Sequence, residues 1–322
     1  MSKKALPFWL ILLLSAASAA QANEVKLSGQ AGAFADIGLG LRPLGLGGAY
    51  SALAADENAV RWNPSLLADV HDPIAGFTWT NQFSLIPYHY LSTAIPVRGV
   101  LGAGEDLGTG AYFVSAGDQA YRETTVGLGV GFKGPQIHIP VEKLRLGAAV
   151  KLLFTSFGND EEGGEDRVTG SSLGYSLDLG AAFHVTQEVV VAAVLSDLVN
   201  DITWDSSQKG SYSEGLPRNL ILGAGIEKSS VTLSFEFRPG LYADVKDRMV
   251  MGAEAALWKF LKPRLGFARN LSSQNPNQWV TAGLGIDIKP KGWGPIRCIN
   301  FGYTQMFHKI DSSPRVGLVI GW

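Results

Sequence analysis

Apolar and polar side chains alternate along most of the chain from about residue 73 to its end. The clearest example is the run 172–183, in which every second residue is apolar and the residues between them are small or polar. Successive side chains of a β-strand point to opposite faces, so this period of two predicts a strand with one apolar face and one polar face. Residues 144–154 and 231–238 repeat the pattern.

Two architectures contain strands of this kind. A soluble β-sandwich buries the apolar faces in its core, whereas a transmembrane barrel turns them to lipid and keeps the polar faces in its lumen. The alternating runs are about ten residues long, which is enough to cross a membrane when tilted, while strands of soluble proteins average about five or six. Val316, Leu318, Ile320 and Trp322 share one face at the end of the chain and resemble the terminal aromatic strand of bacterial outer-membrane barrels. The pattern therefore predicts an all-β transmembrane barrel.

About 14 antiparallel strands can be placed. An even number returns the last strand to the periplasmic side, and it puts the long segments 159–170 and 198–215 on the outer side and the short turns 185–187 and 228–229 on the periplasmic side. The predicted strands lie near residues 73–82, 86–96, 106–116, 122–133, 142–157, 171–184, 188–197, 216–227, 230–239, 248–258, 261–270, 279–288, 297–306 and 314–322.

Aromatic and apolar residues outside the alternating runs give two further expectations. Four tryptophans near strand ends suit the interfacial aromatic girdles of a barrel; they are Trp258, Trp279, Trp293 and Trp322. Four apolar residues fall in the predicted outer loop 198–215, where they suit the capture of a hydrophobic compound; they are Leu198, Val199, Ile202 and Trp204.

Residues 23–72 have a different texture from the barrel segment 73–322. The stretch 39–48 is rich in glycine, which permits close backbone packing in a narrow space. A polar turn follows and ends in Asn63-Pro64, a strong chain breaker. We predict that 23–72 forms a compact plug, or hatch, inside the barrel, with a motif that comprises Gly47, Gly48, Asp56, Asn58, Asn63 and Pro64.

The same stretch resembles a known family. Gly-Gly-Ala-Tyr at 47–50, Asp-Glu-Asn-Ala-Val at 56–60 and Trp-Asn-Pro-Ser at 62–65 are similar to the N-terminal signature of the FadL-like outer-membrane barrel superfamily, and most similar to its PorV/PorQ family. The chain departs from that signature at Glu57, Arg61 and Ser65. The resemblance implies that the Asn-Pro segment lies where hatch meets barrel and that hatch movement opens a path. A purely structural turn, in which Asp and Asn side chains bond nearby backbone amides, is the alternative.

The faces assigned to the lumen carry both charges and glycines. Pairing between the charges is expected because an unpaired charge in a tight lumen is costly, although a solute path would use the same side chains. The predicted lumen charges are Arg145, Lys151, Asp178, Glu236, Arg238, Glu254, Arg264 and Asp287. The lumen glycines, which leave room for the hatch, are Gly127, Gly129, Gly131, Gly223, Gly225, Gly283 and Gly285.

The first 22 residues read as a signal peptide. Lys3 and Lys4 precede a short apolar run at 8–14, and Ala20-Gln21-Ala22 fits the small-x-small cleavage pattern. The run is too short to span a bilayer as a helix, and the sequence has no later apolar segment of that kind. We expect an exported protein of the bacterial outer membrane.

Composition and scattered motifs narrow the chemistry. A formal net charge of −2 gives no reason to expect nucleic acid, and the single cysteine, Cys298, excludes an internal disulfide framework. The glycine-rich Gly45–Gly48 stretch fails the dinucleotide fingerprint because Tyr50 stands where its third glycine belongs. The five histidines show no metal-ligand or catalytic spacing, so we expect no cofactor and no enzyme. The acidic run 160–166 is either a solvated loop or a cation site.

Two functions fit this reading. The first is passive uptake of hydrophobic small molecules through a hatch-plugged barrel. The alternative is a non-transporting, PorV-like barrel that serves protein secretion or envelope assembly. Expected partners are outer-membrane lipid, a hydrophobic substrate or secretion-system proteins, and the barrel-assembly machinery acting on the C-terminal strand that ends in Trp322. The scaffold alone does not separate the two functions.

Overall fold

The structure is a computed structural model of the 322-residue chain. It describes residues 34, 38–97, 107–134, 144–159, 164, 167–242, 245–258, 260–271, 276–290, 292–310 and 312–322. The predicted signal peptide 1–22, most of 23–37 and the acidic run 160–166 apart from Gly164 lie outside the described residues.

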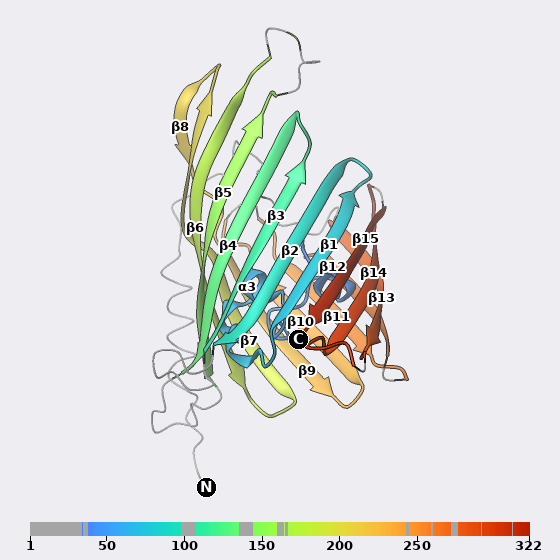
Figure 1. The fold of residues 1–322 in the computed structure, drawn as a ribbon. Coiled ribbons are helices and arrows are strands. Elements are labelled where there is room, and N and C mark those ends of the chain that lie inside the picture. Colours follow the sequence, from blue (N-terminus) through green and yellow to red (C-terminus); the bar gives the residue numbers. More distant parts are fainter. Residues whose placement is uncertain are drawn as a thin grey trace.

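Fourteen antiparallel strands form a closed barrel (Figure 1). The sheet runs β6-β5-β4-β3-β2-β1-β15-β14-β13-β12-β11-β10-β9-β7, and pairing of β6 with β7 closes the ring. The strands are β1 (Ile74–Gln82), β2 (Ile86–Val97), β3 (Leu107–Gly117), β4 (Tyr121–Lys133), β5 (Leu144–Phe157), β6 (Gly170–His184), β7 (Val189–Ser206), β9 (Asn219–Lys228), β10 (Val231–Arg238), β11 (Arg248–Ala255), β12 (Leu261–Asn270), β13 (Gln278–Ile288), β14 (Cys298–His308) and β15 (Ser312–Gly321). The predicted barrel is confirmed, and each of these strands overlaps a predicted one, although β7 extends to Ser206 instead of ending at 197.

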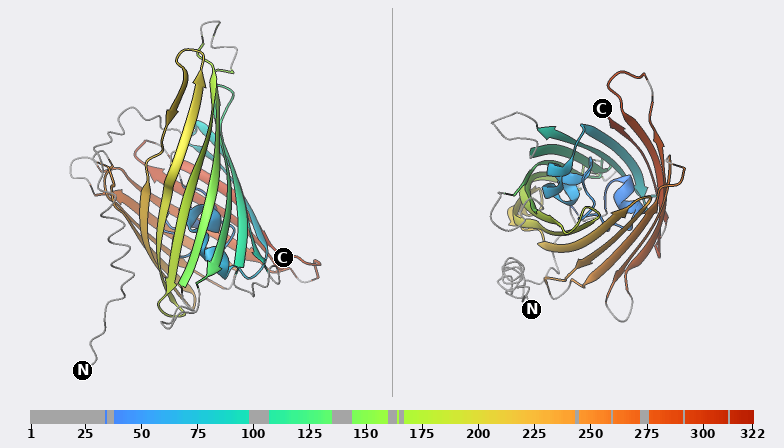
Figure 2. Two further views of the ribbon diagram at one scale, coloured as in Figure 1. Left: turned by 90° about the vertical axis from the view of Figure 1, so that its left-hand side faces the viewer. Right: turned by 90° about the horizontal axis from the view of Figure 1, so that it is seen from below.

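The predicted outer loop 198–215 is wrong in part. Strand β7 continues through it to Ser206, and the chain returns as a short strand, β8 (Gly210–Glu214), that pairs with the upper half of β7. Ile202 and Trp204 keep the inward side of the alternation and are buried, whereas Val199 faces outward. The inward side chains of the hairpin pack together. Because polar residues alternate with them, the sequence pattern favours a loop. Strands β4 to β8 consequently rise above the rest of the wall (Figures 1 and 2).

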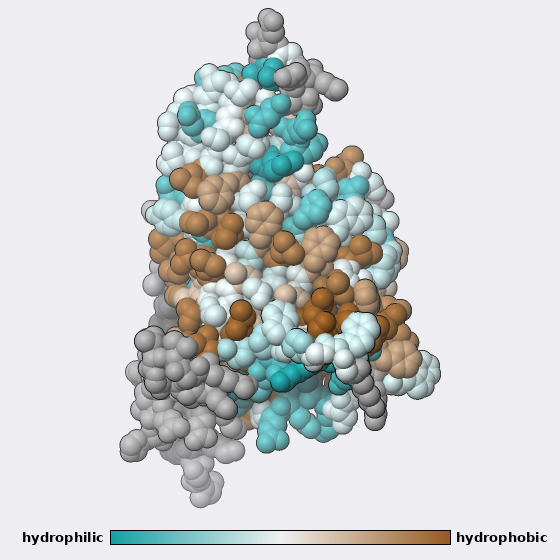
Figure 3. Space-filling model, viewed as in Figure 1, coloured by the Kyte–Doolittle hydropathy of each residue, from teal (hydrophilic) through white to brown (hydrophobic). Residues whose placement is uncertain are grey.

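The apolar faces of the strands point outward. Leu173 is 59% exposed and Leu265 63% exposed, whereas their lumen-side neighbours Ser172 and Arg264 are buried. Brown apolar side chains gather over the middle of the wall, between teal polar regions at its two ends (Figure 3). Because large apolar side chains cover the outside and charges fill the inside, the wall is built for a lipid surround. Among the described residues, no helix is long and apolar enough to cross a bilayer.

Residues 38–72, the continuous described part of the predicted plug, are called the hatch below. They contain α2 (Leu41–Gly45), α3 (Ala59–Trp62) and η1 (Pro64–Asp69), all of which lie inside the ring of strands (Figure 2). Pro64 opens η1, where its missing N–H costs nothing. The hatch side chains Leu46, Tyr50 and Leu67 are fully buried, so the barrel is filled rather than open.

Lumen glycines let the hatch approach the wall. A Cβ placed on Gly131 or Gly147 would overlap the backbone of Pro64 and Ser65, and one on Gly266 would overlap Gly47. The predicted lumen glycines Gly129, Gly131, Gly223, Gly225 and Gly283 all border the hatch. Gly127 and Gly285 instead make room for the wall side chains of Tyr112 and Arg264.

Replacing Gly147 with valine is expected to push η1 off β5, because the new side chain would take the space of the hatch backbone. Overpacking of this kind costs about 1–3 kcal/mol, so the midpoint of heat unfolding, followed by gel mobility in detergent, should fall. The neighbouring Ala148→Val change lies on the outward face of the same strand and serves as the control. An equal midpoint for both variants would contradict tight packing of η1 on β5.

Candidate functional site

A buried carboxylate on β10 joins the wall to the hatch. Glu236 Oε1 accepts hydrogen bonds from the backbone N–H groups of Tyr50 (2.7 Å) and Ser51 (2.6 Å). Its Oε2 accepts from Arg238 Nη2 at 2.9 Å, and the same nitrogen donates to the Gly48 carbonyl at 3.0 Å. Glu236 is only 1% exposed, so these charge-assisted bonds replace the water that the carboxylate loses.

The wall below it holds the hatch through a second network. Glu254 on β11 is paired with Arg264 of β12 at 2.5 Å and with Arg42 of α2 at 3.1 Å. Arg42 Nη2 also reaches Glu227 at 2.8 Å. One guanidinium of the hatch is thus shared by two wall carboxylates.

On the opposite side of the lumen, the last residue of η1 binds two strands. Asp69 accepts from Arg145 of β5 at 2.6 Å and lies 2.8 Å from His184 Nε2 of β6. The hatch is therefore tied to both halves of the barrel.

The remaining predicted lumen charges pair within the wall. Lys151 lies 2.8 Å from Asp178 and 2.6 Å from Asp197. Asp287 pairs with Lys262 at 2.5 Å. All eight predicted lumen charges thus have partners of opposite sign, and four of them, Arg145, Glu236, Arg238 and Glu254, bond the hatch directly.

The sequence prediction missed several lumen charges, among them Arg248 on β11 and Arg315 on β15. Arg315 is the most deeply buried of these. Its side chain is 1% exposed, and its Nη2 donates to Gln82 Oε1 at 2.8 Å. The signal was present, because Arg315 alternates with the outward-facing Val316 in the same period that placed the other charges.

The hatch motif residues form internal turns. Asn63 Nδ2 donates to the Ser51 carbonyl at 2.7 Å, and its Oδ1 accepts from Ser65 N at 3.1 Å and Ser65 Oγ at 2.7 Å. Asp56 Oδ1 accepts from Asn58 N at 3.0 Å, and its Oδ2 accepts from the Tyr50 hydroxyl. These contacts are the turn chemistry expected of such side chains. The proposed part of Asn63-Pro64 in opening a path stays a prediction.

Glu57 is buried between the hatch and the first two strands. A Cβ on Gly76 of β1 would lie 2.8 Å from its Cγ, and its Oε1 accepts from Asn58 Nδ2 at 2.7 Å. Burial, followed by the neighbouring carboxylate of Asp56, raises the pKa of Glu57 to about 8. The raised pKa of Glu57 depends on its burial, so it lasts only while the hatch stays in place.

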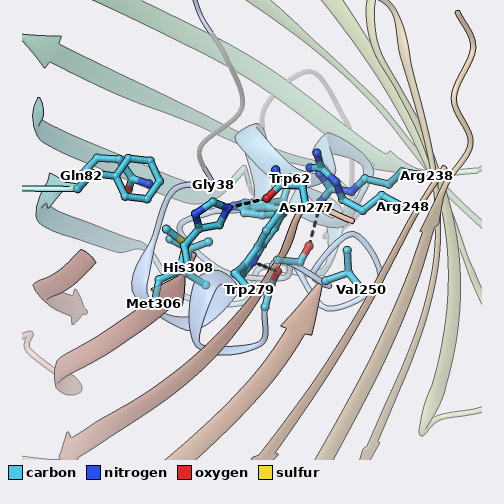
Figure 4. Close-up of a pocket in the computed structure, with 14 residues that line it drawn as sticks. Gly38, Trp62, Gln82, Arg238, Arg248, Val250, Asn277, Trp279, Met306 and His308 are labelled. Atoms are coloured by element: carbon cyan, nitrogen blue, oxygen red, sulfur yellow. Dashed lines mark hydrogen bonds between the residues drawn. The ribbon is translucent and has the colours of Figure 1, made fainter. Parts of the chain in front are cut away.

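A cavity of about 210 Å³ lies between the hatch and the wall (Figure 4). Trp62 and Trp279 form aromatic sides of it, with the guanidinium of Arg238 5.8 Å from the Trp62 ring and that of Arg248 5.1 Å from the Trp279 ring. The described lining residues are Gly38, Leu44, Gly47, Gly48, Trp62, Gln82, Phe83, Arg238, Arg248, Val250, Asn277, Trp279, Met306 and His308.

The cavity is at the outer face of the hatch. Phe83 belongs to the β1–β2 turn, Asn277 precedes β13 and His308 ends β14, all at the end of the barrel away from Trp322. Both chain ends are predicted from the sequence to lie on the periplasmic side, so this is the end predicted to face outward. Gly47 and Gly48, with φ of 72° and 95°, provide a floor of backbone without side chains.

Trp279 corrects one expectation. It was placed in the lipid-facing girdle, but it lies on the lumen side of β13 and its Nε1 donates to the Gly47 carbonyl at 3.3 Å. A position near a strand end does not determine which face a side chain is on. Thr281 is buried in the lumen, and because side chains two residues apart share a face, Trp279 points to the lumen as well. Trp258, Trp293 and Trp322 are exposed, as a girdle requires.

Replacing Glu236 with glutamine is expected to loosen the hatch, because Arg238 loses its buried counter-charge and two hatch amides lose a charged acceptor. Hydrogen exchange of a peptide spanning residues 49–52 should accelerate by about tenfold or more, which corresponds to about 1.4 kcal/mol. Glu188→Gln, at an exposed periplasmic turn, is the matched control. Unchanged exchange in Glu236→Gln would show that this contact does not hold the hatch.

A second prediction concerns pH. Glu57 carries its proton in the folded and unfolded states below about pH 4.5, so its contribution to stability is fully present there and is lost as the pH rises to about 8. Glu57→Gln should remove this loss and flatten the dependence of the unfolding midpoint between these values. Glu188→Gln should retain the wild-type slope. Parallel curves for wild type and Glu57→Gln would contradict the buried, protonated carboxyl.

Comparison with known proteins places the fold. No family model and no curated protein sequence matches the chain. It is similar to the CymD monoaromatic hydrocarbon channel, with 15% identity, a TM-score of 0.58 and coverage of 90% of this chain and 98% of that one. The toluene transporter TodX of Pseudomonas putida gives 12% identity, a TM-score of 0.59 and coverage of 88% and 98%.

A FadL homologue of Pseudomonas aeruginosa gives 12% identity, a TM-score of 0.55 and coverage of 87% and 96%. At such identities the likeness shows the fold alone. The chain therefore has the fold of the FadL-type outer-membrane barrels, a closed antiparallel barrel of 14 strands.

Proposed function

We propose that this protein is an outer-membrane channel for the passive uptake of small hydrophobic molecules. One observation carries the proposal: a wall that faces lipid encloses a lumen filled by a hatch, and the hatch and wall leave an aromatic-sided cavity on the outer face. The likeness in fold to two hydrocarbon channels supports it. The closer resemblance to the PorV/PorQ family, read from residues 47–65, stays a prediction.

An aromatic cluster lies on the inward side of the raised part of the barrel, above the hatch. The ring of Trp204 stacks on Tyr212 with centroids 6.4 Å apart and lies 6.2 Å from Phe157. Leu153 and Ile202 complete the cluster on the inward face of β5 and β7. These side chains are buried against one another, so they would have to separate before the cluster could take up an apolar solute.

Passage from there to the periplasm requires the hatch to move. Its fit to the lumen glycines leaves no room for a substrate beside η1, whereas its outer part, near Gly47 and Gly48, borders the cavity. No coupling motif is found in the sequence, so the direction of transport follows the concentration gradient. Uptake of this kind involves no catalytic step, and the proteins of similar fold are likewise a channel and a transporter.

A role in secretion or envelope assembly is the alternative prediction. Co-purification from native membranes separates the two: a stoichiometric protein partner would favour the alternative, and a solitary barrel would favour uptake. The expected recognition of the last strand by the assembly machinery is tested separately, by deleting Trp322, which ends the strand that pairs with β1.

Uptake can be tested with a hatch that is locked reversibly. A Cβ on Gly223 of β9 would lie 3.5 Å from Ser51 Cβ, within the range of a disulfide. In a Cys298→Ser background, the double change Ser51→Cys and Gly223→Cys should lower toluene entry into proteoliposomes to the rate of protein-free vesicles when oxidised, and a reductant should restore it. Each single cysteine variant is the control.

Toluene uptake by the wild type no faster than by protein-free vesicles would overturn the proposed function. Fast uptake by the oxidised variant would still support a channel, but it would show that movement of the hatch at Ser51 is not needed to open it.

A further inference from the structure

The polar groups of the outer cavity are almost all hydrogen-bond donors. Ile310 N donates to His308 Nδ1 at 3.1 Å, so His308 carries its proton on Nε2 and donates it to Asn277 Oδ1 at 2.5 Å. The carbonyl oxygen of Asn277 is thereby used, and its amide nitrogen remains a donor. The side chain of Asn277 therefore offers the cavity an N–H donor and not a carbonyl acceptor.

The amide group of Gln82, another lining residue, is oriented in the same way as that of Asn277. The buried guanidinium of Arg315 donates to Gln82 Oε1 at 2.8 Å, which again leaves the amide nitrogen as the free end. Arg315 also brings a positive charge directly behind this wall, and its Nη1 is buried with no hydrogen-bond partner among the described residues. A buried guanidinium with an unfilled nitrogen favours negative charge nearby.

Two further guanidiniums complete the cavity. Arg238 and Arg248 line it directly, each against a tryptophan ring. Arg238 pairs with Glu236, and Arg248 donates to Asn270 Oδ1 at 2.9 Å. Among the described lining residues there is no aspartate and no glutamate. The cavity combines apolar aromatic sides with a positive, donor-rich rim (Figure 4).

We infer that this cavity binds a small aromatic carboxylate, a benzoate-like anion, more tightly than a neutral aromatic compound of the same size. A ring fits against Trp62 and Trp279, and a carboxylate presents two acceptors to the planar fork of Arg248, which can bind them as a pair. The volume is suitable, since a cavity of about 150 Å³ holds benzene and this one, at about 210 Å³, leaves room for the carboxylate. The inference rests on the proposed function in naming the substrate of the same channel.

The test measures binding of labelled benzoate to the full-length protein in detergent by equilibrium dialysis. Saturable binding is expected, and benzyl alcohol, of the same size but without charge, should compete at least about tenfold more weakly. Arg248→Gln should weaken benzoate binding by tenfold or more. Arg248→Lys, which keeps the charge but loses the fork, should weaken it less.

The matched control is Arg269→Gln, an exposed arginine at a similar height on the neighbouring strand that does not line the cavity. It should bind benzoate as the wild type does, and unchanged gel mobility before heating would show that every variant is folded. Absence of saturable benzoate binding, equal binding by Arg248→Gln, or equal competition by benzyl alcohol would each overturn the inference.

Toluene uptake by the same preparations separates the two proposals. Toluene uptake together with no benzoate binding would retain the channel and reject the anion site. Benzoate binding that depends on Arg248, without any toluene uptake, would retain the site and reject the hydrocarbon channel.

Discussion

The contact between the Glu236 carboxylate and the backbone of Tyr50 and Ser51 is the interaction on which the arrangement depends. A carboxylate in a filled lumen has lost its water, and only bonds from N–H groups and a guanidinium offset that loss. The hatch supplies the N–H groups, so neither partner is satisfied without the other. The wall of the barrel and its contents are in this sense one folding unit rather than a pore and a separate stopper.

The same logic governs the rest of the lumen. Arg42 and Asp69 of the hatch each meet wall residues of opposite charge. Wall charges such as Lys151 and Asp287 instead pair within the wall. Glycines fill the complementary role, since at Gly131 and Gly147 the absence of a side chain lets η1 lie directly on the strands. Charge fixes where the hatch binds, and glycine sets how closely it approaches.

These contacts are distributed unevenly, and the distribution bears on the proposed uptake. Around η1 the fit to the wall is close and backbone to backbone. At the outer face Trp279 and Arg238 bond the hatch backbone directly, and the hatch also borders the cavity there. Rearrangement is cheapest where fewest packed atoms must separate. In the proposed channel, a substrate in the cavity would lie against a part of the hatch that already borders open space, within reach of the local guanidiniums.

The sequence by itself determined the barrel, the strand positions and the inward direction of the eight lumen charges, because a period of two is a local property that each strand carries in its own residues. The same period would have revealed Arg315 and the inward side of Trp279. It could not show that Glu236 binds a segment 186 residues away, nor that His308 donates a hydrogen bond to Asn277.

Only the tertiary structure decided those contacts, since they join segments whose distance is set by closure of the sheet and not by spacing along the chain. The β7–β8 hairpin is also decided by tertiary contacts. Ile202 and Trp204 lie in a strand because they pack with Leu153 of β5 and Tyr212 of β8. The outer cavity is likewise formed by what hatch and wall leave unfilled, and a volume of that kind has no local signature in the sequence.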